Sequence, residues 1–374
     1  MKEYNKKIDI LFFLGILLLS LRGFFNVSQI VNVPNNVLDI MLLLSYICFL
    51  TKIILMNEKV KKLIVYAFII LIGMIIFINA KQPSVITLFL VVIAAKNIEI
   101  KRIVKFLFII NVLVISVHIC IYILYNVFNL EDIITVKRII DGKEIERISF
   151  FLGHPNTFSS YYFWTYMMYL YIKYDKINIS TYMFMIFSMI FIYIFPNSKT
   201  AVIGFGIVII LLITKKYIID SKHRIIRKVI QYLPLIIGVF SLLSILFYNL
   251  KFIQIIDNFY TGRIVVARGV YETYGIKLFG SALTDSKISF FVNGKYINNI
   301  SSVDSAYYSM ILNSGICGIT LYIYYLQKLS NFLLKNNEIK ELIFFIICVI
   351  YGMLETTCIN PILAFPLLFI SKII

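Results

Sequence analysis

The chain has 374 residues, of which 60% are hydrophobic and only 15% are charged. Ordinary soluble proteins are nearer to half apolar and a quarter charged, so this chain could not bury its apolar surface in water. The composition predicts an all-α polytopic membrane protein. The net charge of +17 comes without a compact basic domain or zinc spacing, so no nucleic-acid partner is expected. The five cysteines lie in or beside apolar runs without a CxxC pair, which predicts buried free thiols.

Apolar runs mark the predicted membrane spans, since a helix needs about 20 apolar residues to cross a bilayer. We expect about twelve spans, with a range of ten to twelve. The fourth is short and could begin near residue 79 or be re-entrant, and the last is interrupted by a proline. The twelve are 8–24, 37–56, 63–79, 84–95, 103–127, 157–172, 180–195, 200–214, 229–249, 305–327, 341–355 and 359–371.

The basic residues orient these spans. With the N-terminus in the cytoplasm, the cytoplasmic segments hold 23 of the 36 Lys and Arg residues, and short outer connections hold only Arg22, Lys81 and Lys199. This asymmetry is the one that the positive-inside rule predicts, so both termini are expected in the cytoplasm. Two long loops, 128–156 and 250–304, then lie outside. The chain has no GxxxxGK[ST] loop, so we expect its chemistry on the outer face and without ATP.

The sequence GHPNT joins the first long loop to the sixth predicted span. Pro155 suits the first helical position, and Gly153 or His154 can cap the helix. The free N–H groups of such a helix start favour an anion, and Arg147 is close enough in sequence to fold over the same point. His154 could take a proton from a hydroxyl or, when charged, contact a phosphate. The alternative is an ordinary helix start with an exposed histidine.

The sequence FPNSKTAVIGFG forms a tight predicted turn between the seventh and eighth spans. Lys199 stands at the outer membrane boundary, where the positive-inside rule disfavours a lysine. One interpretation is a phosphate contact, helped by the hydroxyls of Ser198 and Thr200. The alternative is a lysine whose long side chain simply extends to water.

The sequence YTGRIVVARGVYETYG predicts a helix within the second long loop. Thr261 is the expected cap, Gly275 the expected stop, and Arg268 and Glu272 an i,i+4 pair. Arg263 and Arg268 diverge by roughly 140° around a straight helix, so they do not share one face. The alternative is a solvated amphipathic helix without a binding role.

The sequence VDSAYYSMILNSGICGI opens the tenth predicted span. Asp304 or Ser305 is expected to cap this helix, with binding of a substrate hydroxyl as the other interpretation of Asp304. Gly315 and Gly318 allow close packing against a neighbouring helix. No DxD or HExxH pair occurs in an outer segment, which disfavours a metal-dependent sugar-nucleotide transferase or a zinc protease, so no metal or cofactor is expected.

These four motifs together resemble those of the Wzy-type O-antigen and capsular polysaccharide polymerases, within the O-antigen ligase/polymerase superfamily. The resemblance covers nearly the whole chain, including the span number and the long outer loop late in the sequence. Lysine replaces the usual arginine in the second motif, and the fourth motif matches loosely. The matches, in the family's order, are Gly153-His154-Pro155-Asn156, Ser198-Lys199, Thr261-Gly262-Arg263 and Asp304-Ser305-Ala306-Tyr307.

The resemblance implies a GT-C-like membrane glycosyltransferase of capsule or lipopolysaccharide biosynthesis. Such an enzyme moves a growing glycan from undecaprenyl pyrophosphate onto the next lipid-linked repeat unit, at the outer face of the cytoplasmic membrane. It needs neither a metal nor a nucleotide sugar. The implied partners are the undecaprenyl-pyrophosphate-linked oligosaccharide, membrane lipid, a flippase and a chain-length regulator.

The resemblance also implies roles for individual residues. Arginine binds phosphate bidentately and stays charged as the sugar–phosphate bond breaks, and a base near the acceptor hydroxyl assists attack. The expected roles are Arg263 and Arg268 on the donor pyrophosphate, with Arg147 and Lys199 as second candidates; His154 in acceptor activation, with Glu272 and Asp304 behind it; and Asn156, Tyr271 and Tyr307 as further substrate contacts.

Two other functions remain open. A ligase of the same superfamily would move a finished glycan onto a lipid core or a protein, and the motifs do not separate it from a polymerase. A flippase or transporter of lipid-linked sugars would place ionisable groups near the middle of the membrane and often show repeated halves. The sequence has no convincing internal repeat and its charges cluster in outer loops, which disfavours transport.

Overall fold

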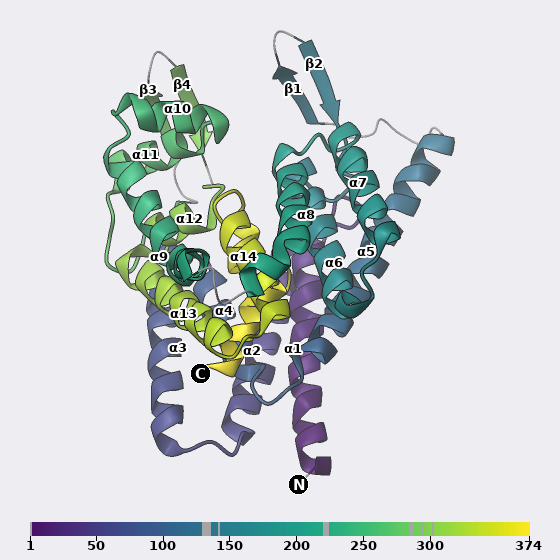
Figure 1. The fold of residues 1–374 in the computed structure, drawn as a ribbon, viewed down its shortest axis with the longest axis vertical. Coiled ribbons are helices and arrows are strands. Elements are labelled where there is room, and N and C mark those ends of the chain that lie inside the picture. The colour runs from purple at the N-terminus through teal and green to yellow at the C-terminus, as the bar shows by residue number, and fades with distance from the viewer. Residues whose placement is uncertain are drawn as a thin grey trace. The chain divides into compact units, whose positions relative to one another are not determined.

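The structure is a computed structural model that describes residues 2–128, 136–140, 143–219, 224–283, 288–292, 295–300 and 303–374, and it is predominantly helical (Figure 1). Two short hairpins supply its described strands. The elements are α1 (Lys2–Val27), α2 (Asn35–Leu55), α3 (Val60–Ala80), α4 (Ser84–Ala94), α5 (Ile100–Phe128), β1 (Val136–Ile140), β2 (Lys143–Arg147), α6 (Pro155–Ile172), η1 (Tyr174–Lys176), α7 (Ile179–Ile194), α8 (Lys199–Ile219), α9 (Arg224–Leu246), α10 (Lys251–Phe259), α11 (Arg263–Tyr274), β3 (Ile288–Val292), β4 (Lys295–Ile300), α12 (Ala306–Leu312), α13 (Gly315–Lys335), α14 (Ile339–Tyr351), η2 (Thr356–Ile359) and η3 (Phe365–Lys372).

Within the described ranges, five helices are long and apolar enough to cross a membrane: α2, α3, α5, α9 and residues Ile8–Val27 of α1. Their outward faces are apolar as well. On α3, for example, Ile64, Phe68 and Ile78 are each more than 60% exposed. Contiguous apolar surface of this kind fits lipid and not water. The prediction of an all-α membrane protein is confirmed at this level, while twelve spans remain a prediction.

The tenth predicted span, 305–327, is interrupted and forms two helices, so the prediction of one continuous helix was wrong. α12 ends at Leu312, and α13 begins at Gly315, whose φ is +72°. A β-carbon on Gly315 would lie 2.3 Å from the carbonyl oxygen of Lys277, which also accepts the N–H of Ile316 at 3.0 Å. The segment after α11 therefore presses its backbone against the start of α13, and only glycine fits there.

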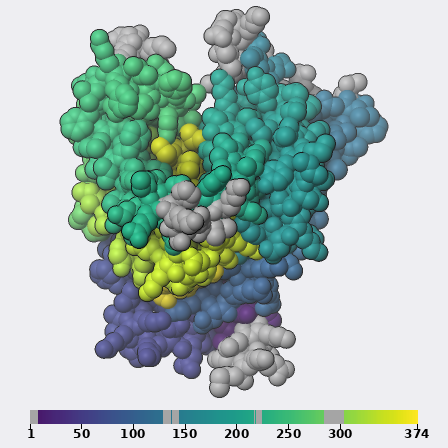
Figure 2. All heavy atoms as spheres, in the orientation of Figure 1, coloured from purple at the N-terminus to yellow at the C-terminus, as the bar shows by residue number. Residues whose placement is uncertain are grey.

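The twelfth predicted span, 359–371, is not an α-helix either. Most of its residues form the 3₁₀ helix η3, which follows another short 3₁₀ helix, η2. Pro361 and Pro366 lie in this segment, and a proline removes an N–H donor and clashes with the preceding turn of an α-helix. Residues 361–371 are nevertheless all buried. In the view of Figure 2, little of this yellow segment reaches the surface.

The chain forms two compact units. The first unit consists of residues Met1–Met56 and Ala94–Thr214. In it α1 packs against α2 and α5, and α5 packs against α6. The hairpin β1–β2 pairs Val136 with Arg147 and Ile140 with Lys143, and its second strand leads into the start of α6. This hairpin occupies part of the first predicted outer loop, whose residues 129–135 and 141–142 lie outside the described ranges.

The second unit consists of residues Asn57–Ile93 and Lys215–Ile374. In it α9 packs against α11, α12, α13 and α14. A hydrophobic cluster joins the end of α9 to α10, α11 and α12, with Ile245, Ile264, Val270 and Leu312 among its buried members. The predicted helix of the second long loop is thus present as α11, and this cluster fixes it on the end of α9.

Candidate functional site

Arg147 links two of the motifs that the sequence analysis singled out. It ends β2, and its side chain is only 5% exposed. Its Nη2 donates to Oδ1 of Asn156 at 2.6 Å, and its Nε donates to the carbonyl oxygen of Pro196 at 2.9 Å. One guanidinium therefore holds the start of α6 against the turn between α7 and α8. The expectation that Arg147 folds over the GHPNT segment is confirmed. Its contact with the second motif was not predicted, and we call the group of Arg147, Asn156 and Pro196 the Arg147 junction.

The four residues before His154 form a constrained turn. Phe150, Phe151 and Gly153 have φ values of +51°, +60° and +60°, a left-handed conformation that is rare for bulky side chains. The Phe150 ring packs on Phe158 at a centroid distance of 4.6 Å, and a β-carbon at Gly153 would lie 3.0 Å from the carbonyl oxygen of Val27. Such strain persists only where surrounding packing imposes it, so this approach to α6 is firmly built.

His154 is the N-cap of α6, and Pro155 occupies the first turn, as predicted. The imidazole Nδ1 accepts a hydrogen bond from the backbone N–H of Asn156 at 3.2 Å, and the side chain is exposed. Because Nδ1 is the acceptor, a neutral ring carries its proton on Nε2. In this geometry Nε2 is a donor, which suits contact with a phosphate oxygen better than removal of a proton from a hydroxyl.

Lys199 begins α8, three residues after the carbonyl that Arg147 holds. Its side chain is exposed, whereas Ser198 and Thr200 are buried and hydrogen-bonded to each other through their hydroxyls at 3.1 Å. The two hydroxyls are thus turned inward. The first unit therefore gathers two helix starts, one buried arginine, one exposed lysine and one exposed histidine around the Arg147 junction, an arrangement suited to an anion.

In the second unit, the start of α11 is capped by Asp257 of α10, a residue that the sequence analysis did not single out. Asp257 is buried, and its carboxylate accepts the N–H of Ile264 at 2.7 Å, the N–H of Val265 at 3.1 Å and the hydroxyl of Tyr248 at 3.1 Å. The prediction that Thr261 caps this helix was wrong, because the carboxylate from α10 takes that role. Burial raises the pKa of Asp257, and these hydrogen bonds oppose the rise.

Arg263 is the first residue of α11 and is buried. Its Nη2 lies 3.4 Å from Oε1 of Glu355, and both side chains are about one-tenth exposed. Its Nη1 also donates to the carbonyl oxygen of Tyr260 and to Oγ1 of Thr261. Glu355 stands 92 residues away in the sequence, and no local signal pointed to it. The guanidinium is thus engaged by the protein itself.

Arg268 fixes α11 to the end of α9. Its Nη1 donates to the carbonyl oxygens of Ile245 and Leu246, both at 2.9 Å, and its Nε donates to Glu272 at 2.7 Å. The guanidinium also lies 5.2 Å from the ring centre of Tyr271. The predicted i,i+4 pair is confirmed. Arg263 and Arg268 contact different partners, as their spacing predicted.

The fourth motif lies at the start of α12. Asp304 is exposed, and Ser305 takes the N-cap position without capping the helix through its side chain. The Ser305 hydroxyl donates instead to the carbonyl oxygen of Gly352 at 3.2 Å, so the predicted N-cap position is confirmed for Ser305 but its hydroxyl does not cap the helix. Tyr307 is fully buried, with its hydroxyl donating to the carbonyl oxygen of Val349 at 3.3 Å.

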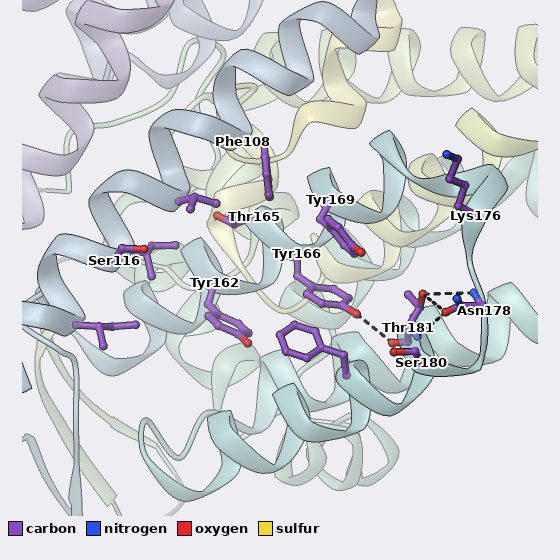
Figure 3. A pocket seen from close by; sticks show the side chains of 14 residues that line it. Phe108, Ser116, Tyr162, Thr165, Tyr166, Tyr169, Lys176, Asn178, Ser180 and Thr181 are labelled. Atoms are coloured by element: carbon purple, nitrogen blue, oxygen red, sulfur yellow. Dashed lines mark hydrogen bonds between the residues drawn. The ribbon is translucent and has the colours of Figure 1, made fainter.

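A cavity of about 700 Å³ lies among α5, α6 and α7 of the first unit (Figure 3). Five of its 14 lining residues are aromatic, and the Tyr166 hydroxyl donates to the carbonyl oxygen of Thr181 at 3.1 Å. Lys176 and Asn178 stand together at one side of it in Figure 3. None of the predicted site residues lines this cavity.

Comparisons with known proteins give no relative: no family model matches the chain, and neither the curated proteins nor the solved structures yield a match. Across the described residues, no three His, Cys, Asp or Glu side chains gather as a metal site. The five cysteines are free thiols, and Cys348 and Cys358 are buried as predicted. Cys48 and Cys317 are only half-buried and Cys120 on α5 is exposed, so burial was wrongly predicted for these three.

Proposed function

We propose that the protein is a Wzy-type polysaccharide polymerase of the cytoplasmic membrane, with about twelve spans, a GT-C-like fold and both termini in the cytoplasm. It would transfer a growing glycan from undecaprenyl pyrophosphate to a lipid-linked repeat unit on the outer face. The observation that carries the proposal is the Arg147 junction. Two motifs that the resemblance treats as functional, about 40 residues apart in the chain, meet at one buried guanidinium.

The chemistry of the transfer explains what such a junction would do. The bond between the sugar and the pyrophosphate oxygen breaks with its electron pair on that oxygen, and the acceptor hydroxyl forms the new glycosidic bond and loses its proton. Fixed donors near the leaving oxygen lower this barrier. Lys199 and His154 are exposed residues and are the proposed contacts of the pyrophosphate, while Arg147 is a positioning residue that holds both helix starts.

The second-unit arginines receive a different role in this proposal. Arg263 is paired with Glu355, and Arg268 is bonded to Glu272 and to the end of α9. Their charges are already balanced within the protein. We therefore place the pyrophosphate at the Arg147 junction, which reverses the order of the candidates drawn from the sequence. Glu272 and Asp304 are exposed residues of the second unit, and their part in acceptor activation stays a prediction from the sequence.

The test is complementation of a deletion strain with variants at matched membrane levels, with polysaccharide length read on a gel. Lys199→Gln and Arg147→Lys should leave mainly single-repeat product, and Lys173→Gln, an exposed lysine of the same unit, should support full-length polymer. Full-length polymer from both Lys199→Gln and Arg147→Lys would refute the site. Long lipid-linked chains in the empty deletion strain would indicate a ligase, and normal polymer there would exclude a polymerase.

His154 allows a sharper comparison, because asparagine is a good N-cap but has no Nε2–H. His154→Asn should therefore keep the start of α6 and still lose long polymer, like His154→Ala. If His154→Asn makes full-length polymer, the histidine serves only as a cap.

A further inference from the structure

The second unit holds an apolar groove between α9 and α13. It is a cavity of about 620 Å³ lined mostly by aliphatic side chains, including Leu235, Val239 and Leu242 from α9 and Ile319 and Ile323 from α13. Its size falls within the roughly 300–1,000 Å³ range of ligand pockets. Three of the lining residues, Leu235, Val239 and Leu242, are exposed, so the groove is open at the surface of the α9–α13 pair.

A second, basic cavity continues this groove. It measures about 230 Å³, is lined by Arg227 and Lys228 from α9 and Lys335 from α13, and shares Asn331 with the apolar groove. Lys328 stands at the same end of the groove, near the ring of Tyr325. The described residues that line the two cavities include four cations and no Asp or Glu.

The charges at this end are not balanced by the acids that follow α13. Glu338 and Glu341 both pair with Lys372. Arg227 caps the end of α13, because its Nη2 donates to the carbonyl oxygen of Leu334 at 2.8 Å and to Oδ1 of Asn337 at 3.4 Å. Lys228 and Lys335 are exposed. The pair of cavities is therefore amphipathic, with an apolar body and a cationic end.

We propose that this groove binds one anionic phospholipid of the surrounding bilayer. The acyl chain lies between α9 and α13, and the headgroup phosphate contacts Arg227, Lys228 and Lys335. Basic pockets between membrane helices select anionic headgroups, and a zwitterionic lipid offers no net charge to this cluster. A free phosphate has no chain for the groove. The site is separate from the pyrophosphate site of the proposed function and does not depend on it.

The experiment uses the purified full-length protein in mixed micelles, titrated with phosphatidylglycerol or phosphatidylcholine and read by native mass spectrometry. Each basic residue near an anionic headgroup contributes about fivefold in affinity. The double variant Lys228→Gln/Lys335→Gln should therefore bind phosphatidylglycerol roughly 25-fold more weakly. Its binding of phosphatidylcholine should not change. Arg227 is left intact because it caps α13.

Two further variants separate the possible outcomes. Lys59→Gln/Lys61→Gln removes the same charge from exposed lysines before and within the first turn of α3 and should bind phosphatidylglycerol normally. Val239→Trp fills the groove and should expel the lipid while the basic cluster stays intact. The proposal is overturned if the Lys228/Lys335 variant weakens binding less than twofold. It is also overturned if inorganic phosphate competes fully while Val239→Trp has no effect. Melting temperatures near that of the wild type establish that each variant is folded.

Discussion

Replacing Arg147 by lysine keeps the positive charge but removes the planar guanidinium that donates to both Asn156 and Pro196. The guanidinium uses Nη2 on Asn156 and Nε on the carbonyl oxygen of Pro196, at 2.6 and 2.9 Å. A hydrogen bond to a charged group contributes roughly 1.5–3 kcal/mol to stability. A lysine ammonium is a point charge and can retain one of the two contacts at best. Arg147→Lys should therefore cost about 2 kcal/mol, and Arg147→Met, which loses both contacts, about 4 kcal/mol.

The assay is unfolding of the purified protein in detergent, with a double-mutant cycle between Arg147→Met and Asn156→Ala. Residues that share a hydrogen bond should show a coupling energy of at least about 0.5 kcal/mol. The matched control is Arg102→Lys, since Arg102 is about half exposed and pairs with Asp9 at 3.5 Å. Such an exposed pair contributes about 0–1 kcal/mol. Equal effects of the two Arg→Lys changes, or strict additivity with Asn156→Ala, would refute the assignment of Arg147 as the junction.

Three other predictions concern the second unit and the helix break. Glu355→Gln leaves the buried charge of Arg263 unpaired and should cost roughly 3–5 kcal/mol, whereas adding Arg263→Gln should recover part of that loss; a double variant as unstable as the sum would contradict the pair. Because burial raises the pKa of Asp257, its charge-dependent contribution to stability is present below the ordinary value near 3.8 and is lost as the pH rises through the raised folded value. Asp257→Asn should remove this pH dependence. If the free energy of unfolding changes with pH equally in the wild type and in Asp257→Asn, the prediction is wrong. Gly315→Ala should fold poorly, because the new β-carbon would lie 2.3 Å from a carbonyl oxygen, whereas Gly206→Ala meets nothing within 4 Å in α8 and should gain up to about 1 kcal/mol; equal expression and melting temperatures would exclude the close approach.

Local signals in the sequence predicted the parts of the fold that depend on local physics. The apolar runs located the helices from α1 to α9, and the start of α6 at Pro155 followed from its proline and cap. The position of Arg147 over the start of α6 could also be predicted from the sequence, since Arg147 is only a few residues before that helix. The end of α11 at Gly275 and the pair of Arg268 with Glu272 are likewise short-range features.

The features that sequence reasoning missed depend on contacts between distant segments. Glu355 reaches Arg263 across 92 residues, and the carbonyl oxygen of Pro196 reaches Arg147 across 49. Nothing in either local sequence specifies such a partner. The break before α13 has the same origin. The sequence predicted that Gly315 packs against a neighbouring helix, whereas in the structure it makes room for the backbone of the distant Lys277. Asp257 was overlooked because it caps a helix that begins six residues after it.

In the proposed polymerase, a lysine at position 199, where the resembled motif has arginine, is consistent with the contacts around it. A bidentate arginine is required where two partners must be held in fixed directions, and in this chain Arg147 meets that requirement from a buried position. Once the two helix starts are fixed by Arg147, the pyrophosphate contact proposed at position 199 would need to supply positive charge but no fixed geometry. Lysine does so, with its ammonium reaching out from the first residue of α8. The division between a buried fork and an exposed charge explains how Ser198-Lys199 could serve a pyrophosphate site without the arginine usual in that motif.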